Sequence, residues 1–191
     1  MKKIALGLFT FLTLMLLPLA SQAVIITFEG SANAQYSAPI TRSGFIFGNP
    51  LGQEQHFHEI MSAGYGHIDN GTGVLLNDRD TEIFVRSSAG SQFSLANVDV
   101  ADFGAVGLNI QGYLNGLVIG TITLNNLGTG YTTLNGASLG NVDKLIFNGI
   151  GGNGGFAIDN INLSPVPLPS AFLLFGPALA GLGLLRRRFI I

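Results

Sequence analysis

Three histidines form the densest group of chemically active residues in the sequence. They lie in HFHEIMSAGYGH as His56, His58 and His67, and Glu59 is adjacent to the second. His56 and His58 would share one face of a strand, because alternate strand residues point the same way. A zinc or copper site is therefore one hypothesis. The spacing matches no known metal signature, since Ser62 stands where the second histidine of an HExxH motif belongs, and a polar surface loop is the simpler interpretation.

Acidic side chains offer a second kind of chemistry. Glycoside hydrolysis needs two carboxylates held about 5 to 9 Å apart. The candidates are Glu54, Glu59, Asp78, Asp80 and Glu82. The sequence contains neither a nucleophile elbow nor a Ser-His-Asp motif, and the segment from Asn77 to Asp80 is typical of a solvated turn. We therefore predict a protein that is not an enzyme, with an extracellular hydrolase or a metal-binding surface protein as the alternative.

Aromatic residues suggest sugar binding, because sugar faces stack on exposed rings. The chain has no Trp, which leaves four tyrosines as candidates, Tyr36, Tyr65, Tyr113 and Tyr131. Tyr36 and Tyr65 are the first candidates for ligand binding because they fall in loop-like sequence. Tyr113 lies in a predicted strand and could belong to the core. The phenylalanines from Phe28 to Phe156 are predicted to form the core.

Strand and turn signals dominate the elements that must position these residues. The clearest is a hairpin over Leu108 to Leu124, in which two β-rich segments are separated by Asn115-Gly116 alone. Asn-Gly also occurs at residues 70–71, 135–136 and 148–149. Further strands are predicted at 24–28, 44–48, 73–76, 82–87, 92–99, 130–134, 142–148 and 156–163.

About ten short strands predict an all-β fold, an antiparallel β-sandwich of jelly-roll type, with a closed barrel as the alternative. Residues 149–155, GIGGNGG, are predicted to form a flexible loop, and Ser164-Pro165 to begin a linker.

The predicted sandwich domain is 24–164. It contains all eleven acidic residues against four basic ones, a formal charge of −7, which excludes a nucleic-acid partner. The absence of cysteine excludes a disulfide framework.

Both ends of the chain carry targeting signals. Residues 1–23 are typical of a signal peptide: Lys2 and Lys3 precede an apolar run, and small residues precede a cleavage point after Ala23. An uncleaved N-terminal membrane span is the alternative. Near the other end, Leu168 to Leu185 contains no charge and would make a helix of roughly 27 Å, close to the ~30 Å core of a bilayer. Three arginines follow it at 186–188, and basic residues beside a span stay in the cytoplasm.

Three features occur in order at this end of the chain: Val166-Pro167-Leu168-Pro169, an apolar span at 168–185, and Arg186, Arg187 and Arg188. This order resembles the PEP-CTERM sorting signal in its VPLPA variant, with Ser170 in place of alanine. The resemblance covers residues 165–191. It implies recognition by exosortase of Gram-negative bacteria, removal of the transmembrane helix, and delivery to the cell surface or the extracellular polymer. From the residues alone, a permanent membrane anchor is an equal alternative. The partners we expect are signal peptidase, exosortase, extracellular polysaccharide, and the membrane before processing.

The ends of the domain resemble those of jelly-roll carbohydrate-binding modules. The matching segments are TFEG at 27–30 and FAIDNINL at 156–163. The resemblance implies that Glu29 and Asp159 share a structural calcium ion. Independently, the hydrophobic alternation slips at Asp159-Asn160, which predicts a β-bulge, whereas a turn that ends one strand face is the alternative. The sequence thus predicts an exported surface or matrix protein with an adhesive, structural or weak carbohydrate-binding role.

Overall fold

Two antiparallel β-sheets lie face to face. The computed structural model describes residues 22–29, 34–36, 38–49, 57–61, 72–79, 82–128 and 130–166. Sheet A has the strand order β11 (Thr132–Asn135), β8 (Phe93–Asp102), β14 (Phe156–Pro165), β6 (Gly73–Asn77), β5 (Phe57–Met61) and β2 (Ala34–Gln35). In addition, β1 (Val24–Ile26) pairs with β14, and β12 (Asn141–Val142) pairs with β8.

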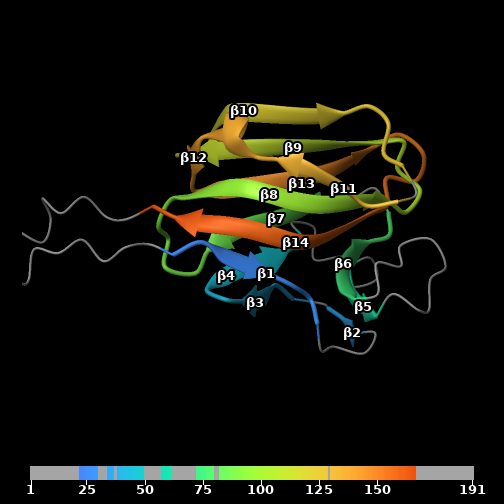
Figure 1. Ribbon diagram of the computed structural model, residues 1–191, viewed down its shortest axis with the longest axis horizontal. Helices are drawn as coiled ribbons and strands as arrows, with labels where there is room; N and C mark the ends of the chain where they lie inside the picture. Colours follow the sequence, from blue (N-terminus) through green and yellow to red (C-terminus); the bar gives the residue numbers. More distant parts are fainter. Residues whose placement is uncertain are drawn as a thin grey trace, which may run out of the picture. The chain divides into compact units, whose positions relative to one another are not determined.

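Sheet B contains six strands. Their order is β10 (Leu117–Leu124), β9 (Gly107–Leu114), β13 (Lys144–Ile150), β7 (Glu82–Ser87), β4 (Phe45–Gly48) and β3 (Ile40–Arg42). Figure 1 looks onto sheet A, with β8 and β14 in front of β7 and β13. A single turn of 3₁₀-helix, Ala137–Leu139, precedes β12. The prediction of an antiparallel β-sandwich is confirmed for the described residues.

The core lies between the two sheets and is rich in phenylalanine. Phe28 of the sheet A side meets Phe47 of β4 edge to face, with ring centroids 5.5 Å apart. Phe45 of β4 meets Phe93 of β8 in the same way at 5.2 Å. Such pairs contribute about 0.5–1.5 kcal/mol beyond the burial of their area. The predicted phenylalanine core is confirmed at 28, 45, 47, 93, 147 and 156, whereas those at 84 and 103 are half-buried.

The predicted hairpin is confirmed. Asn115 and Gly116 form its turn with φ angles of 52° and 80°, and Leu114 pairs with Leu117 across it. Two positive φ values in succession are what a type I′ turn requires. The other described Asn-Gly pairs do not act this way. Gly136 has a φ of −92°, and Asn148-Gly149 lies inside β13 because the strand pairs on both sides there.

Most predicted strands are present, and the largest difference is at 142–148. There the chain forms two strands, since β12 pairs with β8 of sheet A whereas β13 pairs with β7 and β9 of sheet B. The chain crosses between sheets at Asp143, whose N–H donates to the carbonyl of Tyr113 at 2.8 Å. The short strands β2, β3 and β5 lie in segments for which the sequence predicted none. They lack a clear alternation because they contain only two to five residues.

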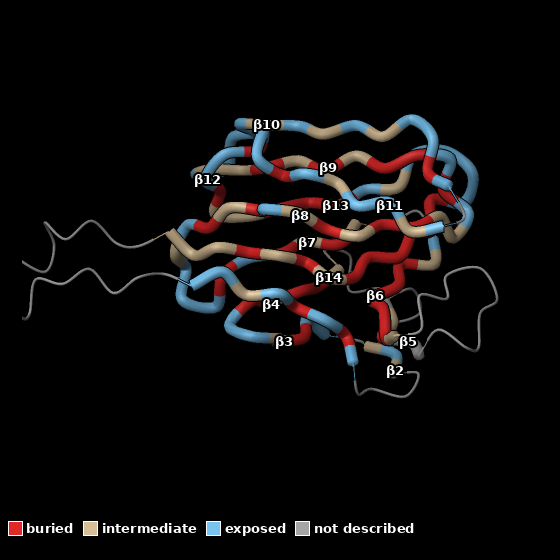
Figure 2. The backbone as a smooth tube through the Cα atoms, in the orientation of Figure 1, coloured by how far each residue is buried: buried red, intermediate tan, exposed pale blue. Residues whose placement is uncertain are grey.

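The predicted bulge in β14 is also confirmed. The register of β14 against β8 shifts between Asp159 and Asn162, and Asn160 has a φ of 47°. The extra residue restores the side chains after it to the inner face. Ile158 before the bulge and Ile161 after it are consequently both fully buried, and Figure 2 shows β14 as buried along most of its length.

Strand β14 continues through the residues that were expected to begin a linker. Ser164 pairs with Ser94, and Pro165 pairs with Phe93. The N–H of Val166 then donates to the carbonyl of Gln92 at 2.8 Å. The fold therefore reaches the first residue of the predicted sorting motif, and residues Gln22–Val166 form one compact unit.

The GIGGNGG segment connects β13 to β14. Its first residues belong to β13, and the rest is hydrogen-bonded to the segment before β9. The N–H groups of Phe103 and Ala105 both donate to the carbonyl of Gly155, and the N–H of Asn153 donates to the carbonyl of Gly104.

In the part of the chain that the structure describes, no helix is long and apolar enough to cross a membrane. Residues 1–21 of the predicted signal peptide and the tail from Pro167, including the span at 168–185 and the arginines, lie outside it.

Candidate functional site

Three neighbouring strands of sheet B each present a mixture of polar and apolar side chains on the face away from the core. On β13, Leu145 and Phe147 point inward and are fully buried, so Lys144, Ile146 and Asn148 point outward. The same alternation holds on β9 and β7. The outward residues of these two strands are Asn109, Gln111 and Tyr113 on β9, and Glu82, Phe84 and Arg86 on β7.

The strand register aligns these nine residues, which we name the sheet B face, in three rows. The first row is Tyr113, Lys144 and Arg86; the second is Gln111, Ile146 and Phe84; the third is Asn109, Asn148 and Glu82. Neighbouring strands lie about 4.8 Å apart, and alternate residues of one strand about 6.7 Å apart. The face therefore presents rings and cations at one end and amides with a carboxylate at the other.

Contacts within the sheet B face hold its side chains in place. The ammonium nitrogen of Lys144 lies 4.4 Å from the ring centroid of Tyr113, and the guanidinium carbon of Arg86 lies 5.6 Å from that of Phe84. The hydroxyl of Tyr113 donates to Oε1 of Gln111 at 3.1 Å. Each cation–π contact contributes about 0.5–1 kcal/mol at an exposed site. The polar groups are thus positioned on a rigid sheet before any ligand arrives.

Gly48 supports the ring of Phe84 from the neighbouring strand β4. A Cβ atom at this position would lie 2.6 Å from Cζ of Phe84, which is too close for any real contact. The ring therefore covers the backbone of β4 directly.

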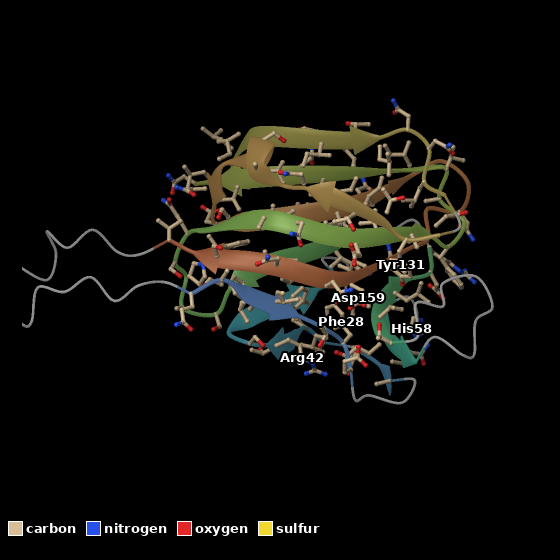
Figure 3. All side chains as sticks on the ribbon, viewed as in Figure 1. Phe28, Arg42, His58, Tyr131 and Asp159 are labelled. Carbon is tan, nitrogen blue, oxygen red and sulfur yellow. The ribbon has the colours of Figure 1, made fainter. Side chains whose placement is uncertain are left out.

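The predicted calcium ligands Glu29 and Asp159 approach two consecutive residues. Oε2 of Glu29 accepts from the N–H of Gly73 at 3.4 Å, and Oδ2 of Asp159 accepts from the hydroxyl of Thr72 at 3.1 Å. Glu29 is exposed, whereas Asp159, which Figure 3 labels on β14, is fully buried. Gly73 permits this approach, since a Cβ atom there would lie 2.2 Å from the carbonyl oxygen of Phe28.

This arrangement fits a hard cation in its donor chemistry. Two carboxylates, the Thr72 hydroxyl and the Phe28 carbonyl are all oxygen donors, which Ca²⁺ prefers. Within the described ranges, no three side chains of the His, Cys, Asp and Glu types gather closely enough to hold a metal. Backbone and hydroxyl oxygens would therefore have to complete the shell around Glu29 and Asp159.

Tyr36, the first predicted ligand-binding tyrosine, belongs to a network between the two sheets. Its hydroxyl donates to Oε2 of Glu59 at 2.7 Å, and Arg42 donates to the same oxygen at 2.8 Å. Glu59 lies on β5 of sheet A and is 1% exposed, whereas Arg42 lies on β3 of sheet B and is 35% exposed. The hydrogen bond to Glu59 raises the pKa of Arg42 above its ordinary value. The Tyr36 ring is half-buried against the core, so less of it remains open to a ligand.

The other predicted residues are placed as follows. Tyr65, His56 and His67 lie outside the described residues. His58 is in β5, and its Nε2 lies 3.5 Å from Oδ2 of Asp78, with the imidazole largely buried (Figure 3). Tyr131 is half-buried against a second apolar cluster around Val74, on sheet A.

The sheet B face is the feature that the sequence analysis missed. Only part of its signal was present. Polar and apolar residues alternate in NIQGY, whereas EIFVR and KLIFN, which also lie inside predicted strands, are polar only at their ends. What the sequence did not contain was the pairing of β13 with both β7 and β9. Only this pairing brings the outward side chains of the three strands together into one surface.

The fold defines the class of this protein as an all-β, two-sheet antiparallel sandwich. No protein-family model matches the sequence, and no curated protein matches it. Among solved structures, the fold is similar to a family 29 carbohydrate-binding module from Piromyces equi, with 11% identity, 76% of this chain and 91% of that chain covered, and a TM-score of 0.43.

Two further solved structures show the same likeness. The K2 cleaved adhesin domain of Lys-gingipain has 12% identity, with 76% of this chain and 99% of that chain covered and a TM-score of 0.46. The family 32 carbohydrate-binding module of NanJ from C. perfringens, in complex with galactose, has 14% identity, with 66% and 97% covered and a TM-score of 0.39. At these identities the likeness is one of fold alone.

Proposed function

We propose that this chain is an exported, non-enzymatic surface or matrix protein whose sandwich binds extracellular polysaccharide weakly through the sheet B face, in an adhesive or structural role. The observation that carries the proposal is the alignment of Gln111, Asn109 and Asn148 on two adjacent strands, β9 and β13, and in two adjacent rows. Amide side chains both donate and accept hydrogen bonds, as sugar hydroxyls do. Their spacing on a flat sheet suits a repeating polymer better than a compact small molecule.

The expected affinity is low. A hydrogen bond formed in exchange for water contributes about 1 kcal/mol net, so four of them supply about 4 kcal/mol, which corresponds to a Kd of about 1 mM. Many copies on one surface would engage one polymer at once and raise the overall strength by avidity. An adhesive role is compatible with weak individual contacts for this reason.

A binding assay tests the polysaccharide proposal. The full chain is run in native gels containing neutral or acidic polysaccharides, and retardation is compared with that of a variant carrying Gln111→Ala and Asn148→Ala. Asn126→Ala, in an exposed loop, is the matched control. We expect the double variant to lose retardation and the control to keep it. Equal retardation of all three proteins would show that the sheet B face is not the binding surface.

Export and sorting are a separate part of the proposal. The signal peptide at 1–23 and the tail at 165–191 support a route through signal peptidase to an inner-membrane intermediate, followed by exosortase processing and release to the cell surface or beyond. The intact mass of the protein from cells with and without exosortase tests this. A chain that begins at Val24 and lacks Ala171 to Ile191 only when the enzyme is present supports it. A full tail in both strains would show a permanent anchor instead.

A structural calcium ion held by Glu29 and Asp159 completes the proposal. Its role would be to join the segment after β1 to the bulge of β14, both of which contact Thr72-Gly73. A divalent cation between the two carboxylates would bind both negative charges.

A further inference from the structure

Two cations lie directly opposite each other on the sheet B face. Lys144 of β13 pairs with Arg86 of β7 in the strand register. Like charges directly opposite each other destabilise a sheet. The domain has only four basic residues against eleven acidic ones, so half of its basic residues occupy this single cross-strand pair. The concentration of positive charge on an otherwise acidic domain needs an explanation.

Neither cation is neutralised by a carboxylate within the part of the chain that the structure describes. Lys144 lies over the Tyr113 ring and Arg86 over the Phe84 ring, so neutral groups hold both. Glu82 is on the same strand as Arg86 but two rows away, about 13 Å along the sheet. The carboxylate of Asp143, next to Lys144, accepts the N–H of Asn115 at 2.6 Å.

The other basic residues of the domain are placed differently. Arg42 forms an ion pair with Glu59 at 2.8 Å and has a structural explanation. Arg79 follows β6, on the other sheet. Lys144 and Arg86 are thus a local positive site, supported by two rings, with the amide of Gln111 one row away and that of Asn148 two rows away.

We propose that this pair binds the carboxylate groups of an acidic polysaccharide, a polymer that contains uronic acid units. This inference rests on the proposed function and specifies its ligand class. The cations would bind the carboxylate, and the amides in the second and third rows would bind hydroxyl groups of neighbouring sugar units. Hydrogen bonds between charged partners are roughly twice as strong as neutral ones, so the acid group would dominate recognition.

Charge favours this occupant over other polyanions. Duplex DNA carries one charge per about 1.7 Å of its axis, and the net charge of −7 on the domain would repel so dense a polyanion. An anionic membrane presents an extended negative surface and would be repelled in the same way. A polyuronate has fewer charges per length, so two cations can bind its carboxylates while the rest of the domain remains acidic.

Polygalacturonate and its fully methyl-esterified form provide the test, because esterification removes the charge and keeps the sugar backbone. Binding of short oligomers to the full chain is measured by calorimetry without added calcium, so that polymer gelling does not interfere. The variants are Lys144→Gln, Arg86→Gln and their combination. Arg79→Gln removes the same charge elsewhere, and Lys144→Arg keeps the charge in place.

We expect each single variant to weaken binding of the acidic oligomer about fivefold and the double variant about twentyfold, the size of effect that solvent-exposed charge pairs give. Arg79→Gln and Lys144→Arg should bind like the wild type, the ester should bind more weakly than the acid, and salt should weaken binding of the acid.

Three results would overturn the inference. Equal binding of acid and ester would show that a neutral polysaccharide is the ligand and would leave the proposed function standing. Tighter binding of duplex DNA or of phosphatidylserine vesicles than of the polyuronate would assign the face to another anion. Absence of binding to every polysaccharide, acidic or neutral, would refute both the inference and the proposed function.

Discussion

Replacing Arg42 by leucine tests the network that joins the two sheets. The substitution leaves Glu59, which is 1% exposed, without the guanidinium that lies 2.8 Å away. Removing one partner of a fully buried ion pair costs about 3–5 kcal/mol. Arg42 is 35% exposed, so solvent screens part of the interaction and we expect about 2–3 kcal/mol. For a domain of this length the loss corresponds to a fall in Tm of roughly 6–12 °C.

The double variant Arg42→Leu with Glu59→Leu separates the charge from the packing. Replacing a whole buried pair by apolar residues is often nearly neutral, so the double variant should be more stable than Arg42→Leu alone. Tyr36→Phe, which removes only a hydroxyl that donates to Glu59, should cost about 1 kcal/mol. Adding the single variant Glu59→Leu completes the double-mutant cycle that isolates the Arg42–Glu59 interaction.

Thermal unfolding followed by circular dichroism measures all of these proteins. Because contact with Glu59 raises the pKa of Arg42, the guanidinium of the wild type stays charged across the neutral range, and its contribution to stability is present at both pH 6 and pH 9. A single variant as stable as the wild type, or a double variant less stable than the single one, would refute the reasoning.

Three other perturbations address the remaining features. Millimolar calcium should raise the Tm of the wild type, and Glu29→Ala with Asp159→Ala should abolish the rise; an unchanged calcium response would disprove the site. Gly73→Ala should destabilise the fold by about 2 kcal/mol or more in urea titrations, because the new Cβ would lie 2.2 Å from the Phe28 carbonyl oxygen. An unchanged stability would mean that the backbone at Phe28 moves away freely. Gly116→Ala should cost about 1–2 kcal/mol in the same assay, since its φ is 80°. Gly128→Ala should cost less, because the new Cβ would come no closer than 4.0 Å to the backbone nitrogen of Gly130.

Much of the fold could be predicted from local patterns. The turn at Asn115-Gly116 and the bulge at Asp159-Asn160 both follow from a few adjacent residues, through backbone preferences and a slip in alternation. The prediction of a core rich in phenylalanine holds at six described positions. Each of these features depends on chemistry that acts within one or two strands.

Features that depend on distant pairing could not be predicted. The crossing of the chain between sheets at Asp143 depends on partners on β8 and β9, which no local signal identifies. Glu59 and Arg42 are far apart in sequence, so nothing in either segment indicated that Tyr36 would lie between them. The sheet B face is of the same kind, because its rows exist only in the register of three strands.

The end of β14 has a mechanical consequence. The strand pairs with β8 along most of its length and with β6 and β1 on its other side, and its last hydrogen bond joins Val166 to Gln92. A pull on the chain at Val166 along the axis of β14 would load its hydrogen bonds to strands on both sides in shear. Backbone hydrogen bonds loaded in shear must break together, whereas those of a peeled strand break one at a time. The placement of the tail on this central strand would therefore let the domain bear tension without unravelling.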